Sequence, residues 1–406
     1  MRPNRRQLLQ LAALAASFPL SANAARGLRV VVVGAGIVGA SVAYHLSRAG
    51  AKVTVIDRYG AAPRASRGTF AWINATWAKQ PRHYHRLNQD SVAEWHQLQR
   101  ELDIPVRWGG SLEWFSDADR QASLVEDVLE QVDWGEPARM MDAAEVTALA
   151  PSLIFPNNGQ AAYSPNDGAV DPVLATLRLL ERAKALGARF LAPCSLQGVT
   201  ERDGRLIAVQ TDNGAIDADR LVLATGAEPE MASRHAGIDV PQRSTPGVIA
   251  ITAPLPPLLS CVVSAPGVHM HQRDDGRVVL GEQDGPPRTE QHRQRLAGYP
   301  YDFPSPELAR EHGRRMLGVA QHFLPALSGA AIESAWIGWR PLPLDGHPVL
   351  GAGPARPDVY LAIMHSGVSL APLVGRLVAR EITTGESLAS LAPYRPTREF
   401  RRVIRY

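Results

Sequence analysis

The sequence predicts a mixed α/β fold that combines a parallel, helix-flanked sheet with a separate antiparallel sheet. A β-branched run at residues 28–33 leads into a glycine-rich turn, a helical segment and a second β-branched run at residues 52–56. This order of strand, helix and strand is typical of parallel sheets. Between residues 246 and 283, short β-type runs around an Asp-Asp-Gly turn indicate antiparallel strands. The 406 residues allow two or three domains.

The excess positive charge of the chain lies at its N-terminus. Lys and Arg total 43 against 40 for Asp and Glu, and Arg2, Arg5 and Arg6 account for the whole excess. The rest of the chain has no basic bias, which argues against a nucleic-acid-binding protein. The 13-residue apolar run at residues 8–20 is too short to span a bilayer, and no later stretch is long enough. We therefore expect no transmembrane span in the mature chain.

Residues 1–24 have the features of an export signal. The Arg5-Arg6 pair before the apolar run resembles a twin-arginine signal, although Asn4 replaces the usual Ser or Thr. Residues 22–24 (Ala-Asn-Ala) offer a small-residue cleavage site. We expect an exported, periplasmic protein, and a cytoplasmic location is the alternative. In a periplasmic protein Cys194 and Cys261 are permitted to pair, but their positions do not require it.

A dinucleotide-binding motif follows the first strand and predicts a Rossmann-like unit. The turn and the helix start comprise Gly34, Gly36, Ile37, Val38 and Gly39. The first glycine permits a tight turn, the second lets the backbone approach a pyrophosphate, and the third lets helix and strand pack closely. The unpaired N–H groups at the helix start would then face the phosphates.

The acidic residue after the second strand narrows the choice of cofactor. Asp57 lies 18 residues beyond Gly39, where a carboxylate can bond ribose hydroxyls. Arg58 follows, but the charge of Asp57 disfavours a 2′-phosphate, so FAD or NAD is expected rather than NADP. A second buried strand at residues 219–226 favours FAD, because it ends in small residues that let a backbone pass a dinucleotide. These are Ala224, Thr225 and Gly226.

Further elements can be predicted from local patterns. Residues 198–211 contain an Asp-Gly turn and read as a β-hairpin, a departure from a plain NAD domain. Residues 83–102 carry a helical apolar stripe of Leu87, Trp95, Leu98 and Leu102. Residues 173–187 repeat this pattern after an Asp-Pro start, with Leu174, Leu177 and Leu180. Residues 284–306 are polar and rich in Gly and Pro, which predicts an exposed connection.

Taken together, these residues resemble the D-amino acid oxidase family of FAD-dependent oxidoreductases, which includes glycine oxidase, sarcosine oxidase and D-amino acid dehydrogenase. The resemblance covers the chain from Leu28 to about Arg398. Besides the first motif, it is carried by residues 65–68, 142–146, 167–172, 221–227, 338–351, 365–367 and 371–372.

The resemblance implies a discontinuous FAD domain of the glutathione-reductase type, interleaved with an antiparallel-sheet substrate domain. The FAD domain would comprise residues 25–80, 150–230 and 340–398. The substrate domain would comprise residues 81–149 and 231–339. The resemblance also implies cofactor contacts at the loop Ser66, Arg67, Gly68 and Thr69, at Val199 in the hairpin, and at the helix start Ser366, Gly367, Val368 and Ser369. That helix start would point at flavin N1 and O2.

Two residues are candidates for the chemistry, again by resemblance. Arg340 matches the arginine that binds the substrate carboxylate in several members, a task that suits a bidentate guanidinium; a structural ion pair is the alternative. His365 could be catalytic, but a positional role beside the flavin is preferred. Met364 replaces a common glycine and leaves the substrate size open. Neither cysteine matches the attachment position of the family, so non-covalent FAD is expected.

We therefore expect an FAD-dependent oxidase or dehydrogenase that acts on a small amine or amino acid. Hydride would pass from Cα to flavin N5, and the imine would be hydrolysed. Oxygen or a quinone-type carrier would accept the electrons, and export favours a quinone. The alternatives are a non-catalytic flavin-binding accessory protein and an NAD-dependent dehydrogenase that uses the first motif alone.

Two aromatic and histidine patterns leave alternatives open. Trp72 and Trp77 would line an aromatic pocket or belong to the core. The histidine pairs at residues 83/85 and 269/271 have a spacing that could bind a metal, but no carboxylate or cysteine cluster accompanies them. We expect solvated or core histidines and no metal.

Overall fold

The computed structural model describes residues 27–75, 79–283, 290, 294 and 300–402. The predicted export signal and Trp77 lie outside the described residues, as does most of the predicted connection at residues 284–306. In the part of the chain that is described, no helix has the length and apolar character needed to cross a membrane.

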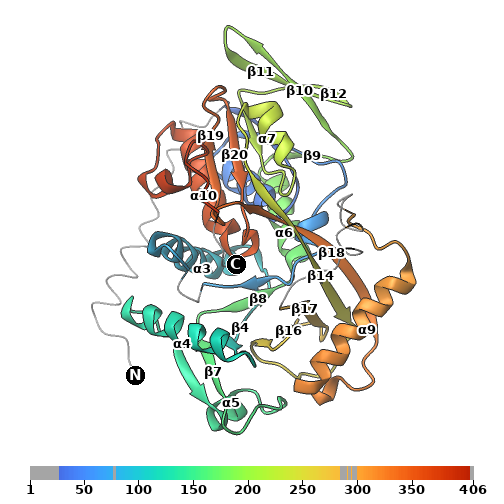
Figure 1. Cartoon of the computed structure of the whole chain (residues 1–406). Helices are drawn as coiled ribbons and strands as arrows, with labels where there is room; N and C mark the ends of the chain where they lie inside the picture. The colour runs from blue at the N-terminus through green and yellow to red at the C-terminus, as the bar shows by residue number, and fades with distance from the viewer. Residues whose placement is uncertain (1–26, 76–78, 284–289, 291–293, 295–299, 403–406) are drawn as a thin grey trace.

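A six-stranded sheet carries the dinucleotide motif (Figure 1). Its strands lie in the order β19 (Val349–Ala352), β20 (Val359–Ile363), β13 (Arg220–Leu223), β1 (Arg29–Val33), β2 (Lys52–Ile56) and β9 (Arg189–Leu191). Neighbouring strands are parallel, except that β19 is antiparallel to β20. Val30 and Val32 of β1 pack into one core, and Val31 and Val33 pack into the core of the opposite face. Both faces of the sheet are therefore covered, as its β-branched runs predict.

Helices cover one face of this sheet, and a small antiparallel sheet covers the other. The helices of the first face are α2 (Ile37–Arg48), α6 (Pro172–Ala185) and α10 (Gly367–Thr384), with α3 (Arg82–Leu102) packed on α10. The second face carries α7 (Pro229–Ala236) and the strands β10 (Leu196–Arg202), β11 (Arg205–Thr211) and β12 (Gly214–Asp217). The predicted hairpin is β10–β11, and its turn residues Asp203 and Gly204 have φ of 52° and 72°, as this turn requires.

The antiparallel prediction is confirmed by an eight-stranded sheet. Its order is β18 (Ile332–Pro343), β14 (Gln242–Thr252), β17 (Val278–Glu282), β16 (Val268–Gln272), β15 (Val262–Ala265), β5 (Ser111–Glu113), β7 (Gln160–Ser164) and β6 (Arg139–Asp142). Neighbours are antiparallel except for β15 and β5. Helix α9 (Pro306–Phe323) packs on this sheet through Met316, Leu317 and Ala320.

The remaining elements of the described chain are a small sheet, two helices and three 3₁₀ turns. A three-stranded sheet is formed by β3 (Trp72–Ile73), β8 (Gly168–Val170) and β4 (Val106–Trp108). The other helices are α4 (Ala118–Asp133), α5 (Ala143–Leu149) and the 3₁₀ turns η1 (Arg64–Ser66), η2 (Pro325–Leu327) and η3 (Ala389–Tyr394).

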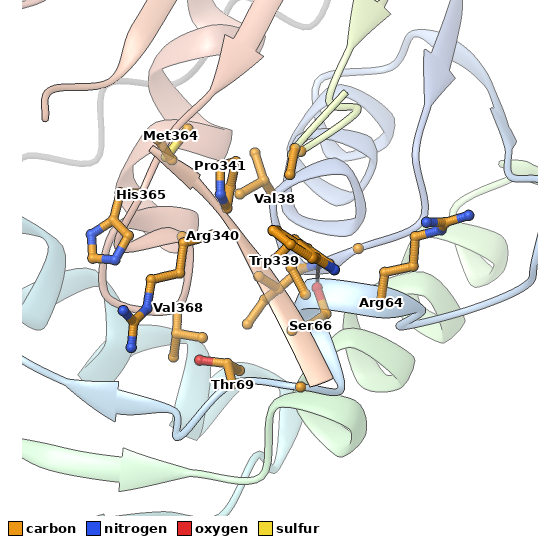
Figure 2. A pocket seen from close by; sticks show the side chains of 18 of the residues that line it. Val38, Arg64, Ser66, Thr69, Trp339, Arg340, Pro341, Met364, His365 and Val368 are labelled. Atoms are coloured by element: carbon orange, nitrogen blue, oxygen red, sulfur yellow. Dashed lines mark hydrogen bonds between the residues drawn. The ribbon is translucent and has the colours of Figure 1, made fainter. Parts of the chain in front are cut away.

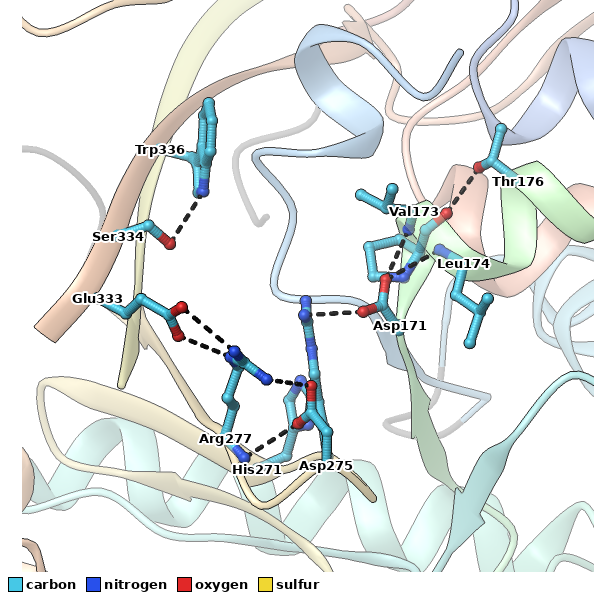
Figure 3. Close-up of polar contacts among 12 residues, drawn as sticks. Asp171, Val173, Leu174, Thr176, His271, Asp275, Arg277, Glu333, Ser334 and Trp336 are labelled. Atoms are coloured by element: carbon cyan, nitrogen blue, oxygen red, sulfur yellow. Dashed lines mark hydrogen bonds and ion pairs between the residues drawn. The ribbon is translucent and has the colours of Figure 1, made fainter. Parts of the chain in front are cut away.

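Helix α3 agrees with the prediction, whereas the predicted stripe of α6 is only partly correct, because Leu180 is buried but Leu174 is only half-buried. Asp171 caps α6 by accepting hydrogen bonds from the backbone N–H groups of Val173 and Leu174 (Figure 3). The side chain of Leu177, however, is 38% exposed. The buried residues are Pro172, Ala175, Thr176, Leu179, Leu180 and Ala183. Small residues form much of this face because α6 packs directly on α2.

Ion pairs tie the hairpin β16–β17 to its surroundings. Arg277 binds Glu333 of β18 at 2.7 Å and Asp275 at 2.9 Å (Figure 3). Arg273 binds Asp171, the cap of α6, at 2.8 Å. The Arg277–Glu333 pair joins the hairpin to β18 within the eight-stranded sheet, and the Arg273–Asp171 pair joins it to α6 beside the first sheet.

Sheet membership differs from the expected domain boundaries at two places. Strand β7 lies within residues 150–230, which were assigned to the FAD domain, but it pairs with β5 and β6 in the eight-stranded sheet. Strand β18 continues to Pro343, past the expected boundary at residue 340. The assignment of one part to FAD and the other to substrate stays a prediction, because sheet membership does not identify a ligand.

The two cysteines do not pair. Cys194 and Cys261 are both buried free thiols. Cys194 lies in the core beneath β10 and β11, and Cys261 lies in the core of the eight-stranded sheet. Since they belong to separate cores, the disulfide that export would permit is not formed.

Candidate active site

A cavity of about 1320 Å³ opens where the two large sheets meet. The end of β1, the start of α2 and the turn η1 line it on one side, and β14 and β18 line it on the other. The turn that precedes α10 also contributes. The cavity thus lies at the carboxyl ends of parallel strands, where ligands bind in such folds.

The glycine turn is built for close approach of backbones. Gly34 has φ of +108°, and a Cβ there would overlap the carbonyl of Ala224 at the end of β13. A Cβ on Gly39 would overlap the carbonyl oxygen of Gly34. The turn therefore needs both glycines and a small residue at position 224. This is the geometry that a dinucleotide-binding turn requires.

Two predicted cofactor residues also hold this turn in place. Asp57 accepts a hydrogen bond from the Ala35 N–H at 2.8 Å and another from the Tyr59 N–H at 2.7 Å. Ser66 accepts one from the Ile37 N–H at 3.0 Å. Both side chains also line the cavity. Asp57 and Ser66 therefore have two roles: they hold the backbone amides of the turn in position, and their own side chains face the cavity.

We expect Asp57→Ala to weaken FAD binding and to destabilise the fold. Without the carboxylate, the Ala35 N–H is left without its acceptor, which costs about 1–3 kcal/mol. The dissociation constant for FAD should rise roughly 10- to 100-fold, measured by flavin fluorescence with thermal unfolding in parallel. Asp217→Ala is a matched control, because Asp217 is an exposed carboxylate paired with Arg29. Equal FAD affinity in the two variants would contradict this role.

Arg340 projects from β18 toward the same part of the cavity as His365 (Figure 2). Its guanidinium lies over Gly247 of β14, with Nη2 3.3 Å from where a Cβ of that residue would lie. Among the described residues, no carboxylate forms an ion pair with Arg340, and burial alone lowers its pKa. The structural ion pair considered as the alternative is therefore not formed within this part of the chain. A desolvated cation without a counter-charge favours an anionic ligand.

His365 is a neutral histidine at the edge of the cavity. Burial, with added repulsion from Arg340, Lys79 and Arg243, lowers its pKa to about 3. Its Nδ1 lies 3.1 Å from the hydroxyl of Ser366. At neutral pH the ring carries no charge, so it can donate or accept a hydrogen bond but cannot bind an anion electrostatically. The preferred positional role stays a prediction.

The start of α10 presents backbone N–H groups to the cavity. Ser366, Gly367, Val368 and Ser369 all line it, and no side-chain hydrogen bond caps the helix. The segment is held from behind by Trp95, whose indole N–H donates to the Val368 carbonyl at 2.9 Å. Uncapped N–H groups at a helix start attract negative charge, so this end of the cavity suits an electron-rich group.

Most of the predicted cofactor residues line the cavity, and three do not. Those that line it are Gly34, Gly36, Ile37, Val38, Asp57, Arg58, Ser66, Gly68, Thr69, Ala224, Thr225, Gly226, Ser366, Gly367, Val368 and Ser369. Gly39 instead packs on Gly34, and Arg67 stacks 5.1 Å from the ring of Trp336. Val199 lies farther along β10, and residues 194–197 line the cavity in its place.

The structure adds a cation that the sequence does not single out. Arg64 lies between the rings of Tyr59 and Tyr301, 4.0 and 3.9 Å from their centroids. In Figure 2 it lies on the opposite side of the pocket from Arg340 and His365. Nearby, Arg58 binds Glu228. No short motif marks Arg64, because one of its two aromatic partners, Tyr301, lies far from it in the sequence.

The other aromatic and histidine candidates have structural partners. Trp72 lines the cavity and donates its indole N–H to Asp167 at 2.8 Å. His271 lies 2.8 Å from the Phe70 carbonyl, and His83 lies 2.9 Å from the Tyr394 hydroxyl. The residues that the structure describes contain no group of three side chains able to hold a metal ion.

Comparison with known sequences identifies the family. The model of the FAD dependent oxidoreductase family matches residues 29–381. Glycine oxidase of Pseudomonas putida is 26% identical over 388 residues, which cover 91% of this chain and 98% of that protein. A component of the opine oxidase of Agrobacterium tumefaciens is 24% identical over 373 residues, which cover 88% and 94%.

Solved structures share the fold. Glycine oxidase from Geobacillus kaustophilus gives a TM-score of 0.80 at 23% identity, covering 92% of this chain and 99% of that one. L-proline dehydrogenase from P. horikoshii gives 0.78 at 24% identity, covering 91% and 97%. The NAD-dependent alternative is excluded, and the glycine turn, the uncapped helix start and the cavity between them all suit FAD. The chain belongs to the DAO family of FAD-dependent oxidoreductases.

Proposed function

We propose that this enzyme oxidises an amino acid or a related carboxylate-bearing amine. The observation that carries the proposal is Arg340, which lines the cavity and forms no ion pair with any described residue. The glycine oxidase and opine oxidase relatives are named for carboxylate-bearing amines. A guanidinium with no described counter-charge, beside the start of α10, is well suited to hold such a substrate by its carboxylate.

The residues of the cavity would position the substrate rather than perform acid–base chemistry. FAD, when bound, supplies an acceptor for a hydride. Arg340 would fix the carboxylate through two parallel hydrogen bonds and so orient the Cα–H bond. Gly68 and Gly338 permit this placement, because a Cβ on Gly68 would lie 2.6 Å from the Gly338 Cα. The substrate loses a hydride from Cα and a proton from nitrogen, and water then hydrolyses the imine.

Anaerobic reduction of the flavin tests this proposal. D-amino acids, glycine, N-methyl amino acids and simple amines would be screened for bleaching of the flavin absorbance. We expect bleaching by a subset of the carboxylate-bearing amines. If no amine bleaches the flavin of a fully loaded protein, the non-catalytic accessory protein is the better explanation. Repeating the positive reactions with oxygen and with a quinone analogue identifies the electron acceptor.

We also propose that the twin-arginine signal exports the protein to the periplasm, where membrane quinones favour a dehydrogenase. The support is the sequence of residues 1–24 alone. N-terminal sequencing of periplasmic protein should begin at Ala25, and a double Lys substitution of Arg5 and Arg6 should retain the chain in the cytoplasm. Full-length wild-type protein confined to the cytoplasm would contradict export.

A further inference from the structure

Arg64 lies in the loop that holds the glycine turn in place. It is the first residue of η1, and its carbonyl accepts hydrogen bonds from the backbone N–H groups of Arg67 and Gly68 at 3.1 and 2.8 Å. Ser66, in the same 3₁₀ turn, accepts a hydrogen bond from the Ile37 N–H at the start of α2. The side chain of Arg64 therefore leaves the backbone close to the helix start that the phosphates of a dinucleotide approach.

The backbone of Arg64 has a conformation that is unusual for an arginine. Its φ is +50°, in the left-handed region that residues with a Cβ seldom adopt. Such a conformation persists only where the surroundings enforce it, and it clusters at active sites and at residues that clamp ligands. The backbone therefore marks Arg64 as a candidate for a binding role.

Two tyrosines cover the two faces of the Arg64 guanidinium. Tyr59 and Tyr301 both lie within 4.0 Å of its Cζ, measured from the ring centroids, and all three side chains line the cavity. Contacts of this kind fix the plane of a guanidinium. They leave its N–H groups at the edge, where an anion can accept two parallel hydrogen bonds. The Nε atom is buried and has no hydrogen-bond partner in the described part of the chain.

Tyr301 is held in place by the strand that carries Arg340. The carbonyl of its neighbour Pro300 accepts a hydrogen bond from the indole N–H of Trp339 at 2.9 Å. Trp339 is buried in β18, and in the view of Figure 2 it lies between Arg340 and Arg64. Tyr301 is therefore fixed to the eight-stranded sheet while its ring covers an arginine of the η1 loop.

Arg64 forms no ion pair with any described residue. Glu228 contributes a negative field at Arg64, but its ion pair is with Arg58. Arg234 and Arg402 also line the cavity, but both are exposed and neither has an aromatic ring over its guanidinium among the described residues. Arg64 is therefore better preorganised to bind an anion than either of these two arginines.

From this arrangement we infer that Arg64 binds the pyrophosphate of FAD and that Tyr301 holds it in the binding position. The inference concerns retention of the cofactor, and it holds whichever amine is oxidised. A pyrophosphate offers paired oxygens that match the fork of N–H groups on a guanidinium. Because Tyr59 and Tyr301 already fix the plane of that group, little side-chain entropy is lost when the phosphate binds. Loss of Arg64 should therefore speed the release of FAD.

The first test compares FAD release from the Arg64→Met and wild-type holoenzymes. Methionine keeps an apolar side chain between the rings and removes the charge. We expect the dissociation constant for FAD to rise roughly 10- to 100-fold, as for loss of a charged hydrogen bond, with flavin fluorescence after dilution as the signal. Arg310→Met is the matched control, because Arg310 is exposed on α9 and does not line the cavity. An unchanged dissociation constant in Arg64→Met would overturn the inference.

A second test separates phosphate binding from stacking. ADP and adenosine would compete with FAD for the apoprotein of each variant, since ADP carries a pyrophosphate and adenosine carries none. Arg64→Met should bind ADP roughly tenfold or more weakly, with less than about threefold change for adenosine. Equal losses for the two ligands would overturn the inference, because Arg64 would then act on the adenosine or on the fold. If Arg64→Met does not fold, Arg64→Lys should keep more of the ADP affinity than Arg64→Gln.

Tyr301→Ala tests whether the ring acts through Arg64. FAD release should be roughly 3- to 10-fold faster in this variant, because the guanidinium loses one of its two rings. Adding Tyr301→Ala to Arg64→Met should change the release rate little, since both substitutions then affect one interaction. Additive effects would contradict the role given to Tyr301. None of these measurements needs turnover, so a protein whose flavin no amine bleaches would refute the proposed function and leave this inference to be decided by FAD and ADP binding.

Discussion

Replacing Arg340 by alanine should reduce kcat/KM for a carboxylate-bearing substrate about 10²- to 10³-fold while FAD remains bound. Loss of a buried partner of a charged group costs roughly 2–5 kcal/mol, and each 1.4 kcal/mol is a factor of about ten. Arg340 has no described ionic partner, so its removal leaves no orphaned carboxylate among the described residues. The loss should therefore appear in catalysis and not in stability. Anaerobic stopped-flow reduction of the flavin measures it directly.

Substrate and variant controls make this result specific to the carboxylate. An amine that lacks a carboxylate should react at similar rates with the wild type and with Arg340→Ala. Arg340→Lys should recover part of the activity, because it keeps the charge but loses the bidentate geometry. Arg277→Ala removes a half-buried arginine of the turn that precedes β17 and does not line the cavity, and it should leave kcat/KM unchanged. If Arg340→Ala loses FAD, or if its kcat/KM falls equally for amines with and without a carboxylate, Arg340 has a structural role.

Replacing Gly39 by alanine should abolish FAD loading and destabilise the protein. A Cβ at this position would overlap the backbone carbonyl of Gly34, which has no side-chain freedom with which to yield. Overpacking of this kind lowers the free energy of unfolding by about 1–3 kcal/mol or more. The overlap could be removed only if the cofactor-binding turn itself moved. The ratio of flavin to protein absorbance in the purified variant should fall to roughly a tenth of the wild-type value or less. Thermal unfolding of the apoprotein measures how far the substitution destabilises the fold in the absence of FAD.

A second glycine provides the matched control for this prediction. Gly318 lies within α9, and a Cβ there would meet no atom within 4 Å. Gly318→Ala should keep full FAD loading. Its free energy of unfolding should rise by about 0.5–1 kcal/mol, because alanine is the better helix former. Normal FAD content in Gly39→Ala would mean that the turn relaxes without losing its ligand, contrary to the close contact argued above.

Local patterns predicted the elements whose residues are contiguous in the chain. The strand, glycine turn and helix of residues 28–48 are determined by β-branched and glycine positions that act within one supersecondary unit. The hairpin at Asp203 and Gly204 follows from turn chemistry alone. Periodicity was a weaker guide where small residues form the contact, since it selected Leu177 of α6 for a face that Ala175 and Leu179 bury.

Short sequence patterns predict the dinucleotide turn, and the resemblance that they carry predicts the FAD-dependent family and Arg340 as the candidate for the substrate carboxylate. These rest on short segments whose conformation depends on near neighbours. The packing of separate elements shows in addition that Arg340 lacks an ionic partner among the described residues and that Lys79 lines the same cavity. Arg243 and Arg340 share a sheet face through the register of β14 on β18, and Asn74 is held to α10 by its hydrogen bond to Ser369. Such long-range contacts leave no periodic mark on the sequence, because each is fixed by the packing of separate elements.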